Sequence, residues 1–137
     1  MDANMNVRRA GNVAVAVLHG EYDLGNAAVL NAELVDVLRC RPAGIVLDVA
    51  EVDFCDLACL RSMANLGRRA AAVGIWVRIA GPKPMLRRLL DVTGLGSSLP
   101  AYPDVELALR GSRRPPRVPG GRVTESLAVD ARTSAGA

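Results

Sequence analysis

Residues 45–63, IVLDVAEVDFCDLACLRSM, constrain the fold of this chain more than any other segment. Residues 45–49 are apolar apart from one aspartate, a composition typical of a buried strand. Asp56 precedes a run of apolar side chains with helical spacing, so we expect it to cap the N-terminus of a helix. A strand that turns directly into a helix points free backbone N–H groups and the positive end of the helix dipole outward. A ligand or partner that binds at this turn would therefore meet the start of the helix.

Segments typical of strands and of helices alternate along the rest of the chain. The pattern predicts strands at residues 5–9, 13–18, 45–49, 75–80 and 99–102, and helices at residues 27–39, 56–73, 85–92 and 105–110. Residues 19–23 are predicted to form a loop, Asn26 and Asp104 to cap helices, and Gly74 and Gly94 to end them. Strands that alternate with helices favour parallel crossover connections, so the sequence predicts a layered α/β domain.

The length and the apolar runs limit the class of protein. A chain of 137 residues suffices for one domain with a sizeable core. No apolar run approaches the roughly 20 residues that cross a bilayer, and the N-terminus lacks the basic start and apolar core of a signal peptide. We therefore expect a cytoplasmic protein that has no membrane partner.

The net charge of +3 is unevenly distributed along the chain. Residues 111–137 hold five arginines and two acids and account for the whole excess. Residues 1–110 are therefore neutral, which gives no indication of nucleic-acid binding. Residues 111–137, rich in Arg, Pro and Gly, are predicted to be a disordered tail with a transient helix at 123–131. The tail is either an inert extension or a nonspecific contact with nucleic acid or membrane.

Cysteine and histidine are too few for a metal site. The three cysteines, Cys40, Cys55 and Cys59, are an odd number without an export signal, so no disulfide framework is expected. Cys55 and Cys59 lack a second ligand cluster and the only histidine is His19, so no zinc or other metal is expected. No nucleophile–base pair or glycine-rich phosphate loop is apparent, so we expect neither an enzyme nor a cofactor.

Three segments, taken in order, resemble the motifs of the STAS domain, and among STAS domains those of bacterial anti-sigma-factor antagonists. LHGEYD (18–23) resembles the motif L-x-G-E-[LI]-D, and LDVAEVDFCD (47–56) resembles the strand and turn L-D-[LV]-x-x-[VL]-x-F-x-D. RRLLDVTGL (87–95) resembles R-[LI]-[LF]-[DE]-x-[ST]-G-L at a helix end. The resemblance covers about residues 5–110. It implies a STAS-like (SpoIIAA-like) α/β fold, with a mixed sheet of four to five strands and helices mainly on one face.

The chain departs from the family at the turn. There the aspartate precedes a serine that a kinase-type anti-sigma factor phosphorylates, followed by Ser or Thr and then Gly; here Leu57, Ala58 and Cys59 follow Asp56. Leu57 occupies the position of the serine, so the resemblance implies no phosphosite. It implies a non-enzymatic antagonist that binds a serine-kinase-type anti-sigma factor, frees a sigma factor and escapes phosphorylation at that site. The partner-binding residues that the resemblance implies are Glu21, Tyr22, Asp23, Asp56, Leu57, Ala58 and Arg61.

Several of these residues also have a purely structural interpretation. In this interpretation Asp56 is simply a helix cap, whose loss costs about 1 kcal/mol. Leu57 is either an apolar anchor for a partner or a residue that drifted into an abandoned phosphosite. Glu21 and Asp23 can form a solvated acidic turn. As an alternative to the antagonist, the domain is a scaffold or a self-associating homodimer that no longer responds to a kinase.

Two neighbouring residues could replace the missing serine as a switch. Cys59 lies in the first turn of the helix, where the dipole lowers the pKa of a thiol, so it could form a redox switch with Cys55. The alternative is that both cysteines are small, semi-buried residues. Ser62 lies one helical turn beyond the position of the missing serine and is either another phosphoacceptor or an ordinary surface residue.

Overall fold

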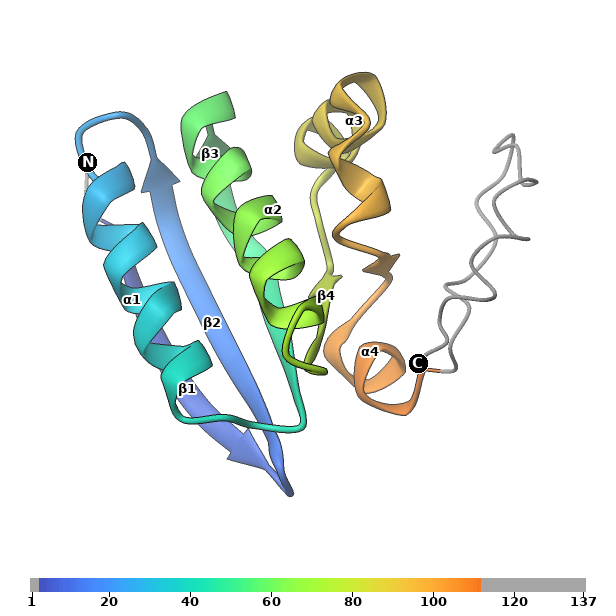
Figure 1. The fold of residues 1–137 in the computed structure, drawn as a ribbon. Coiled ribbons are helices and arrows are strands. Elements are labelled where there is room, and N and C mark those ends of the chain that lie inside the picture. The colour runs from blue at the N-terminus through green and yellow to red at the C-terminus, as the bar shows by residue number, and fades with distance from the viewer. Residues whose placement is uncertain (1–2, 112–137) are drawn as a thin grey trace.

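The protein is described by a computed structural model that covers residues 3–111 and contains five strands and four α-helices in that range (Figure 1). The order is β1 (Ala3–Ala10), β2 (Val13–Tyr22), α1 (Ala27–Arg39), β3 (Gly44–Cys55), α2 (Leu57–Ala71), β4 (Trp76–Ala80), α3 (Pro84–Thr93), a 3-10 turn (Leu95–Ser97), β5 (Ala101–Tyr102) and α4 (Val105–Arg110). Nearly all of the predicted tail, including 123–131, lies outside the described residues.

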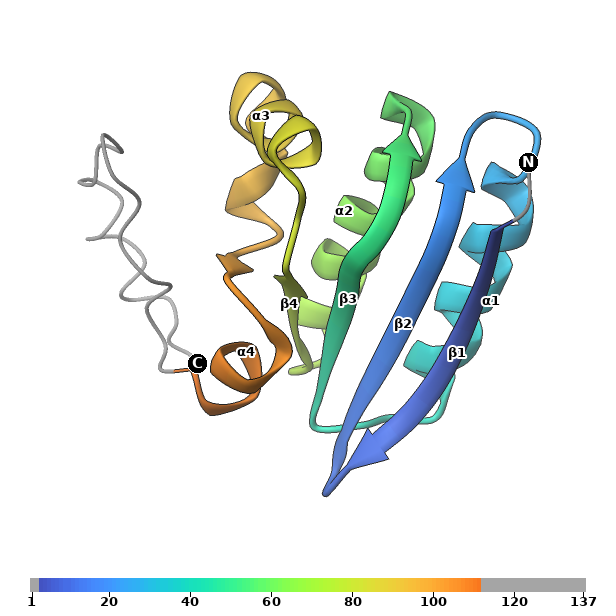
Figure 2. The same cartoon turned by 180° about the vertical axis from the view of Figure 1, so that it is seen from behind.

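The strands form one mixed sheet in the order β1-β2-β3-β4-β5. β1 is antiparallel to β2, and β2 to β5 are mutually parallel (Figure 2). Because β2, β3 and β4 are parallel, their carboxyl ends lie at one end of the sheet, where α1, α2 and α3 begin. The predicted mixed α/β architecture is therefore confirmed.

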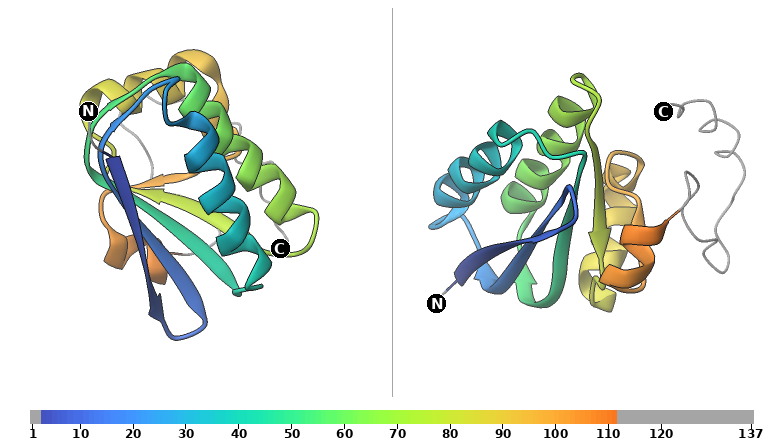
Figure 3. Two further views of the ribbon diagram at one scale, coloured as in Figure 1. Left: turned by 90° about the vertical axis from the view of Figure 1, so that its left-hand side faces the viewer. Right: turned by 90° about the horizontal axis from the view of Figure 1, so that it is seen from below.

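The helices lie mainly on one face of the sheet. α1 and α2 run side by side across β2 and β3, and α4 lies on the opposite face beside β4 and β5 (Figure 3). α4 covers the smaller of two apolar clusters, which contains Val15, Val46, Ala80, Tyr102 and Ala108. This arrangement agrees with the prediction from the resemblance.

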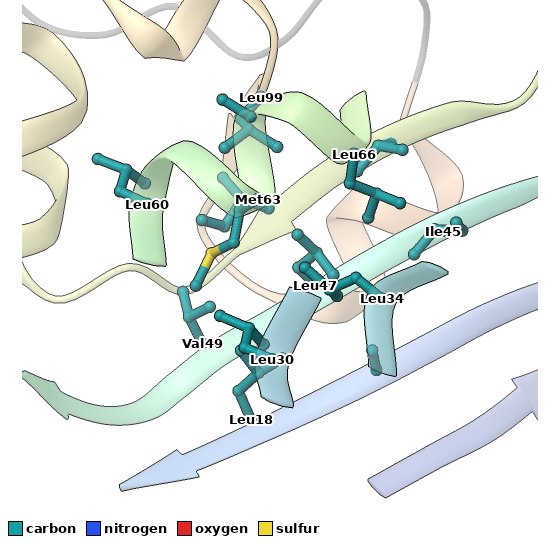
Figure 4. Packing of buried hydrophobic residues seen from close by; sticks show 14 of the residues in the cluster. Leu18, Leu30, Leu34, Ile45, Leu47, Val49, Leu60, Met63, Leu66 and Leu99 are labelled. Atoms are coloured by element: carbon teal, nitrogen blue, oxygen red, sulfur yellow. The ribbon is translucent and has the colours of Figure 1, made fainter. Parts of the chain in front are cut away.

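The main core lies between the sheet and the α1–α2 layer (Figure 4). Its fully buried members come from alternate positions of β2 and β3 and from one face of each helix: Leu18, Ile45, Leu47, Val49, Leu30, Leu34, Leu60 and Met63. Burying one such side chain contributes about 1.5–3 kcal/mol. The core fixes how the starts of α1 and α2 are placed relative to the strand ends.

The largest error of the sequence prediction concerns the ends of β2 and β3. β2 continues to Tyr22 through the predicted loop 19–23, and β3 continues to Cys55 instead of ending at residue 49. Register shifts between Val17 and His19 and between Gly20 and Glu21 allow the two strands to keep pairing. Such irregularities break the alternation of apolar and polar side chains by which strands are recognised in a sequence.

Most other boundaries differ from the prediction by at most two residues, and the caps of two helices are confirmed. The carboxylate of Asp104 accepts from the backbone N–H of Leu107 at 2.8 Å, and Gly94 ends α3 with a left-handed φ of 76°. Asn26 occupies the N-cap position of α1 as predicted, but its side chain makes no cap hydrogen bond to the helix. It instead accepts from the N–H of Asp23 at 2.9 Å and donates to the carbonyl of Glu21 at 3.0 Å.

Candidate functional site

The ends of β2 and β3 bring two of the recognised segments together. Tyr22 and Cys55 are paired in the parallel ladder, and the N–H of Asp56 donates to the carbonyl of Tyr22 at 2.9 Å. Residues 18–23 therefore lie directly beside the turn that starts α2. The predicted site residues on these two segments share one end of the sheet, although they are far apart in sequence.

Asp56 caps α2 as predicted. Its backbone is extended, with φ of −84° and ψ of 176°, and its Oδ1 accepts from the N–H of Cys59 at 3.1 Å. The bond satisfies one of the N–H groups left free at the helix start, and the negative carboxylate lies at the positive end of the helix dipole. The side chain is only half-buried, so the cap also lies on the surface.

Leu57, Ala58 and Arg61 lie on the first turns of α2. Leu57 is 36% exposed, Arg61 is exposed and Ala58 is half-buried. Leu57 is the first residue of the helix. The position at which the resemblance places a phosphorylated serine is thus on the surface and carries an apolar side chain.

Tyr22 does not lie on the surface, which corrects its prediction as a partner-binding residue. Its side chain is 2% exposed and belongs to the main core. Its hydroxyl donates to the carbonyl of Asn4 at 2.9 Å, which ties β1 to the end of β2. Burial, reinforced by the charge of Glu33, raises the pKa of the Tyr22 hydroxyl to about 12. Tyr22 supports the site from behind.

Glu21 and Asp23 flank Tyr22; Glu21 is half-buried and Asp23 is exposed. The carboxylate of Asp23 accepts from the N–H of Gly25 at 2.9 Å, a local bond that shapes the loop between β2 and α1. This bond uses one carboxylate oxygen. The acidic turn is therefore both a folded loop and a source of negative charge next to Asp56.

Cys55 and Cys59 are buried, with 1% and 0% of their surfaces exposed. Burial raises the pKa of the Cys55 thiol to about 12 and that of Cys59 to about 11, the nearby Asp56 adding to both. The expected lowering by the helix dipole is wrong, because desolvation of the thiolate outweighs it. A protonated, buried thiol is a poor redox sensor, so the small-residue interpretation holds.

The thiol of Cys59 has a structural partner that the sequence did not reveal. It donates to the carbonyl of Asp23 at 3.3 Å, which links the β2–α1 loop to the first turn of α2. The hydroxyl of Ser62 donates to the carbonyl of Ala58 at 3.3 Å within the same helix. Phosphorylation of Ser62 would break this bond.

Two further features were missed by the sequence reasoning. Leu24 is 74% exposed and directly follows Asp23, and Phe54 is 43% exposed and lies two residues before Asp56. Lys83, at the start of α3, forms a 2.7 Å ion pair with Asp53 near the end of β3. Convergence of the parallel strand ends was the signal that could have located them.

Within residues 3–111, no three His, Cys, Asp or Glu side chains are grouped in a way that could hold a metal ion. In the same range no helix is long and apolar enough to cross a membrane.

Comparisons with known proteins agree with this geometry. Residues 4–108 match the family model described as the STAS domain. A Mycobacterium tuberculosis protein whose name assigns it as an anti-anti-sigma factor is 31% identical over 112 residues, which cover 78% of this chain and 76% of that protein. The crystal structure of an anti-sigma factor antagonist from Mycobacterium paratuberculosis has a TM-score of 0.75 at 25% identity, over 82% of this chain and 96% of that one. The phosphorylated form of the Bacillus cell fate determinant SpoIIAA shares the fold, with a TM-score of 0.62 at 18% identity over 80% of this chain and 100% of that one.

Proposed function

Since this chain belongs to the STAS domain family, we propose that it is an anti-sigma-factor antagonist. In this role it binds an anti-sigma factor and thereby frees the sigma factor that the anti-sigma factor had sequestered. The names of the two mycobacterial relatives support the role. The protein acts by binding and not by catalysis, a view supported by the names of the same relatives.

The partner in this proposal is an anti-sigma factor of the serine-kinase type, and the antagonist is not switched off at the usual position. The kinase type rests on the resemblance, and the observation that carries the missing switch is Leu57, an exposed apolar side chain at the start of α2. A phosphate at this position would add about −1.5 to −2 charges to the docking surface. Leucine cannot accept a phosphate, so the protein stays competent to bind whatever the activity of the kinase.

The contact surface consists of the accessible members of the predicted set. These are Glu21, Asp23, Asp56, Leu57, Ala58 and Arg61. Leu57 provides apolar area and the carboxylates provide charge, a combination typical of a partly apolar interface with a polar rim. Tyr22 lies behind this surface and holds β2 against β1.

The test uses the kinase-type anti-sigma factors of the native host, purified and mixed with the full chain and ATP. Binding is measured by calorimetry and phosphorylation by intact-mass spectrometry. We expect wild type to bind one of them and stay unmodified at position 57. Leu57→Ser should become phosphorylated and then release the kinase, whereas the matched control Leu57→Ala should bind more weakly than wild type and stay unmodified. Failure of wild type to bind any of these kinases would refute the antagonist role.

A second candidate is a scaffold that associates through the open edge of its sheet. Within residues 3–111, β1 pairs only with β2, and its outer edge is unoccupied. Exposed edge strands can pair with another chain, although the exposed Arg8 and Arg9 are typical of edges protected against such pairing. A dimeric mass in light scattering, together with no binding to a kinase-type anti-sigma factor, would favour the scaffold.

A further inference from the structure

Exposed large apolar side chains are concentrated at one end of the molecule. Five of the nine in the described range lie where the parallel strands end and the helices begin: Leu24, Val29, Phe54, Leu57 and Met85. The other four are spread over β1, the segment after α2, the end of α3, and α4: Val7, Val73, Val92 and Leu107. Single exposed apolar residues are ordinary, but a concentration of them marks an interaction surface. We refer to these five residues as the apolar end surface.

Packed elements fix the positions of these residues. Leu24 follows Asp23, whose carbonyl accepts the thiol of Cys59 at 3.3 Å, so the loop that carries Leu24 is bound to α2. Phe54 lies at the end of β3, where it is paired with Glu21. A surface built on such anchored segments loses little entropy when a partner binds.

The ion pair between Lys83 and Asp53 extends the surface to α3. Asp53 precedes Phe54 directly, and Met85 follows Lys83 by two residues. The 2.7 Å contact between Lys83 Nζ and Asp53 Oδ1 shows that the start of α3 lies beside the end of β3. Figure 1 shows the starts of α1, α2 and α3 at the same end of the sheet.

The charges around the apolar end surface indicate what kind of partner fits it. Glu21, Asp23 and Glu51 lie on the β2 and β3 segments of this end, and within residues 3–111 none of them forms an ion pair, although the charge of Lys83 interacts with that of Glu51. The exposed Arg61 adds one positive charge at the start of α2. The excess of carboxylates next to exposed apolar area complements a partner surface that is apolar in the middle and mainly basic at its border.

We propose that the apolar end surface is one docking site, and that the anti-sigma factor covers it with an apolar groove bordered by Arg or Lys side chains. This inference rests on the proposed function and adds the partner's chemistry and three anchors outside the predicted set. The anchors are Leu24, Phe54 and Met85. Affinity then comes from burial of apolar area across the starts of α2 and α3, and the carboxylates accelerate association.

The experiment measures binding of the full chain to the purified anti-sigma factor by calorimetry. Phe54→Ser and Met85→Ser should each raise the Kd at least about tenfold, because anchors at the centre of an interface carry most of its affinity. Val73→Ser and Val92→Ser are the controls, since both side chains are more exposed than Phe54 and Met85 but lie outside the end surface, and the Kd of each variant should stay within about twofold of wild type. Glu51→Lys should slow association and reduce its dependence on salt. Circular dichroism melts verify that each variant is folded.

Each outcome separates the two proposals. Wild-type binding that Phe54→Ser and Met85→Ser leave unchanged would overturn the docking site and leave the antagonist role standing. Absence of wild-type binding would overturn both. A wild-type dimer that Phe54→Ser converts to a monomer would show that a second copy of this chain occupies the surface, and would overturn the assignment to the anti-sigma factor.

Discussion

Replacing Gly44 with alanine should destabilise the domain, although alanine is ordinarily better than glycine inside a strand by about 0.5–1 kcal/mol. Gly44 and Trp76 are direct partners in the β3–β4 ladder. A Cβ on Gly44 would lie 2.0 Å from Cε2 and 2.2 Å from Cζ2 of the indole, where real Cβ contacts stay above 3.0 Å. Either the indole or one of the two strands must therefore move.

The indole of Trp76 is held in place by its neighbours, so the loss of stability in Gly44→Ala depends on what it costs to move the ring. The guanidinium carbon of Arg78 lies 3.9 Å from the centroid of the Trp76 ring, and Arg78 Nη1 donates to the carbonyl of Ala108 at 2.8 Å. Moving the ring therefore also disturbs the contact that holds α4 on the sheet. Overpacking of this kind costs about 1–3 kcal/mol, so Gly44→Ala should lose about 1–2 kcal/mol after the gain in strand propensity.

A double-mutant cycle with Trp76→Ala tests the cause. Without the indole, Gly44→Ala should stabilise by about 0.5–1 kcal/mol, which gives a coupling energy of about 1.5–3 kcal/mol. Urea unfolding followed by far-UV circular dichroism measures all four proteins, because Trp76 is the only tryptophan and its fluorescence is lost in two of them. An equal effect of Gly44→Ala in both backgrounds would show that the reasoning from the indole contact is wrong.

Three further stability measurements follow from the site and its surroundings. Asp56→Ala should lose about 1 kcal/mol of unfolding free energy and Asp56→Asn only part of it, because asparagine still caps α2; urea midpoints that do not change would contradict the cap. Burial raises the pKa of Cys55 to about 12 and that of Cys59 to about 11, so just above pH 9 these two thiols ionise only in the unfolded chain. The free energy of unfolding should therefore be intact below pH 9 and fall as the pH rises towards 11–12, with each unit of pKa shift worth about 1.4 kcal/mol. A variant with alanine at both positions should show a shallower fall in thermal melts across this range. Gly67→Ala should destabilise α2 instead of stabilising it, because the added Cβ would lie 2.5 Å from the carbonyl oxygen of Ser98; a rise in the melting temperature would contradict that close approach.

The sequence predicted best those elements whose signals are local. α1 and α4 have the predicted bounds, since each has a helical apolar pattern and one clear boundary. α1 ends before the Arg-Pro-Ala-Gly segment, and α4 starts directly after Asp104. The helical cap at Asp56 was likewise predictable from residue type and position. The alternation of strands and helices supplied the layered α/β class, and the recognised motifs supplied the family and the mixed character of the sheet.

The errors concern properties that depend on the whole fold. β2 and β3 continue because bulges keep them paired, and no pattern within either strand encodes that pairing. Tyr22 is buried because β1 and α1 cover it, and the Cys59 thiol is held protonated because the core surrounds it. Burial of this kind appears only once segments distant in sequence are packed together.

The resemblance marks two departures from the family pattern in the first turn of α2, at Leu57 and at Cys59. The structure predicts that the family's residue is more easily restored at the first position than at the second. Leu57 is 36% exposed, so a change to serine removes less buried apolar area than a change at a core position would. Cys59 stands where the family has glycine, but its thiol is fully buried and donates to the carbonyl of Asp23. Glycine there would leave a gap in the core, remove the donor and cost about 1 kcal/mol in helix propensity. A single substitution would therefore restore the hydroxyl that the resemblance implies at the exposed position, whereas the buried position is constrained by the residues packed around it.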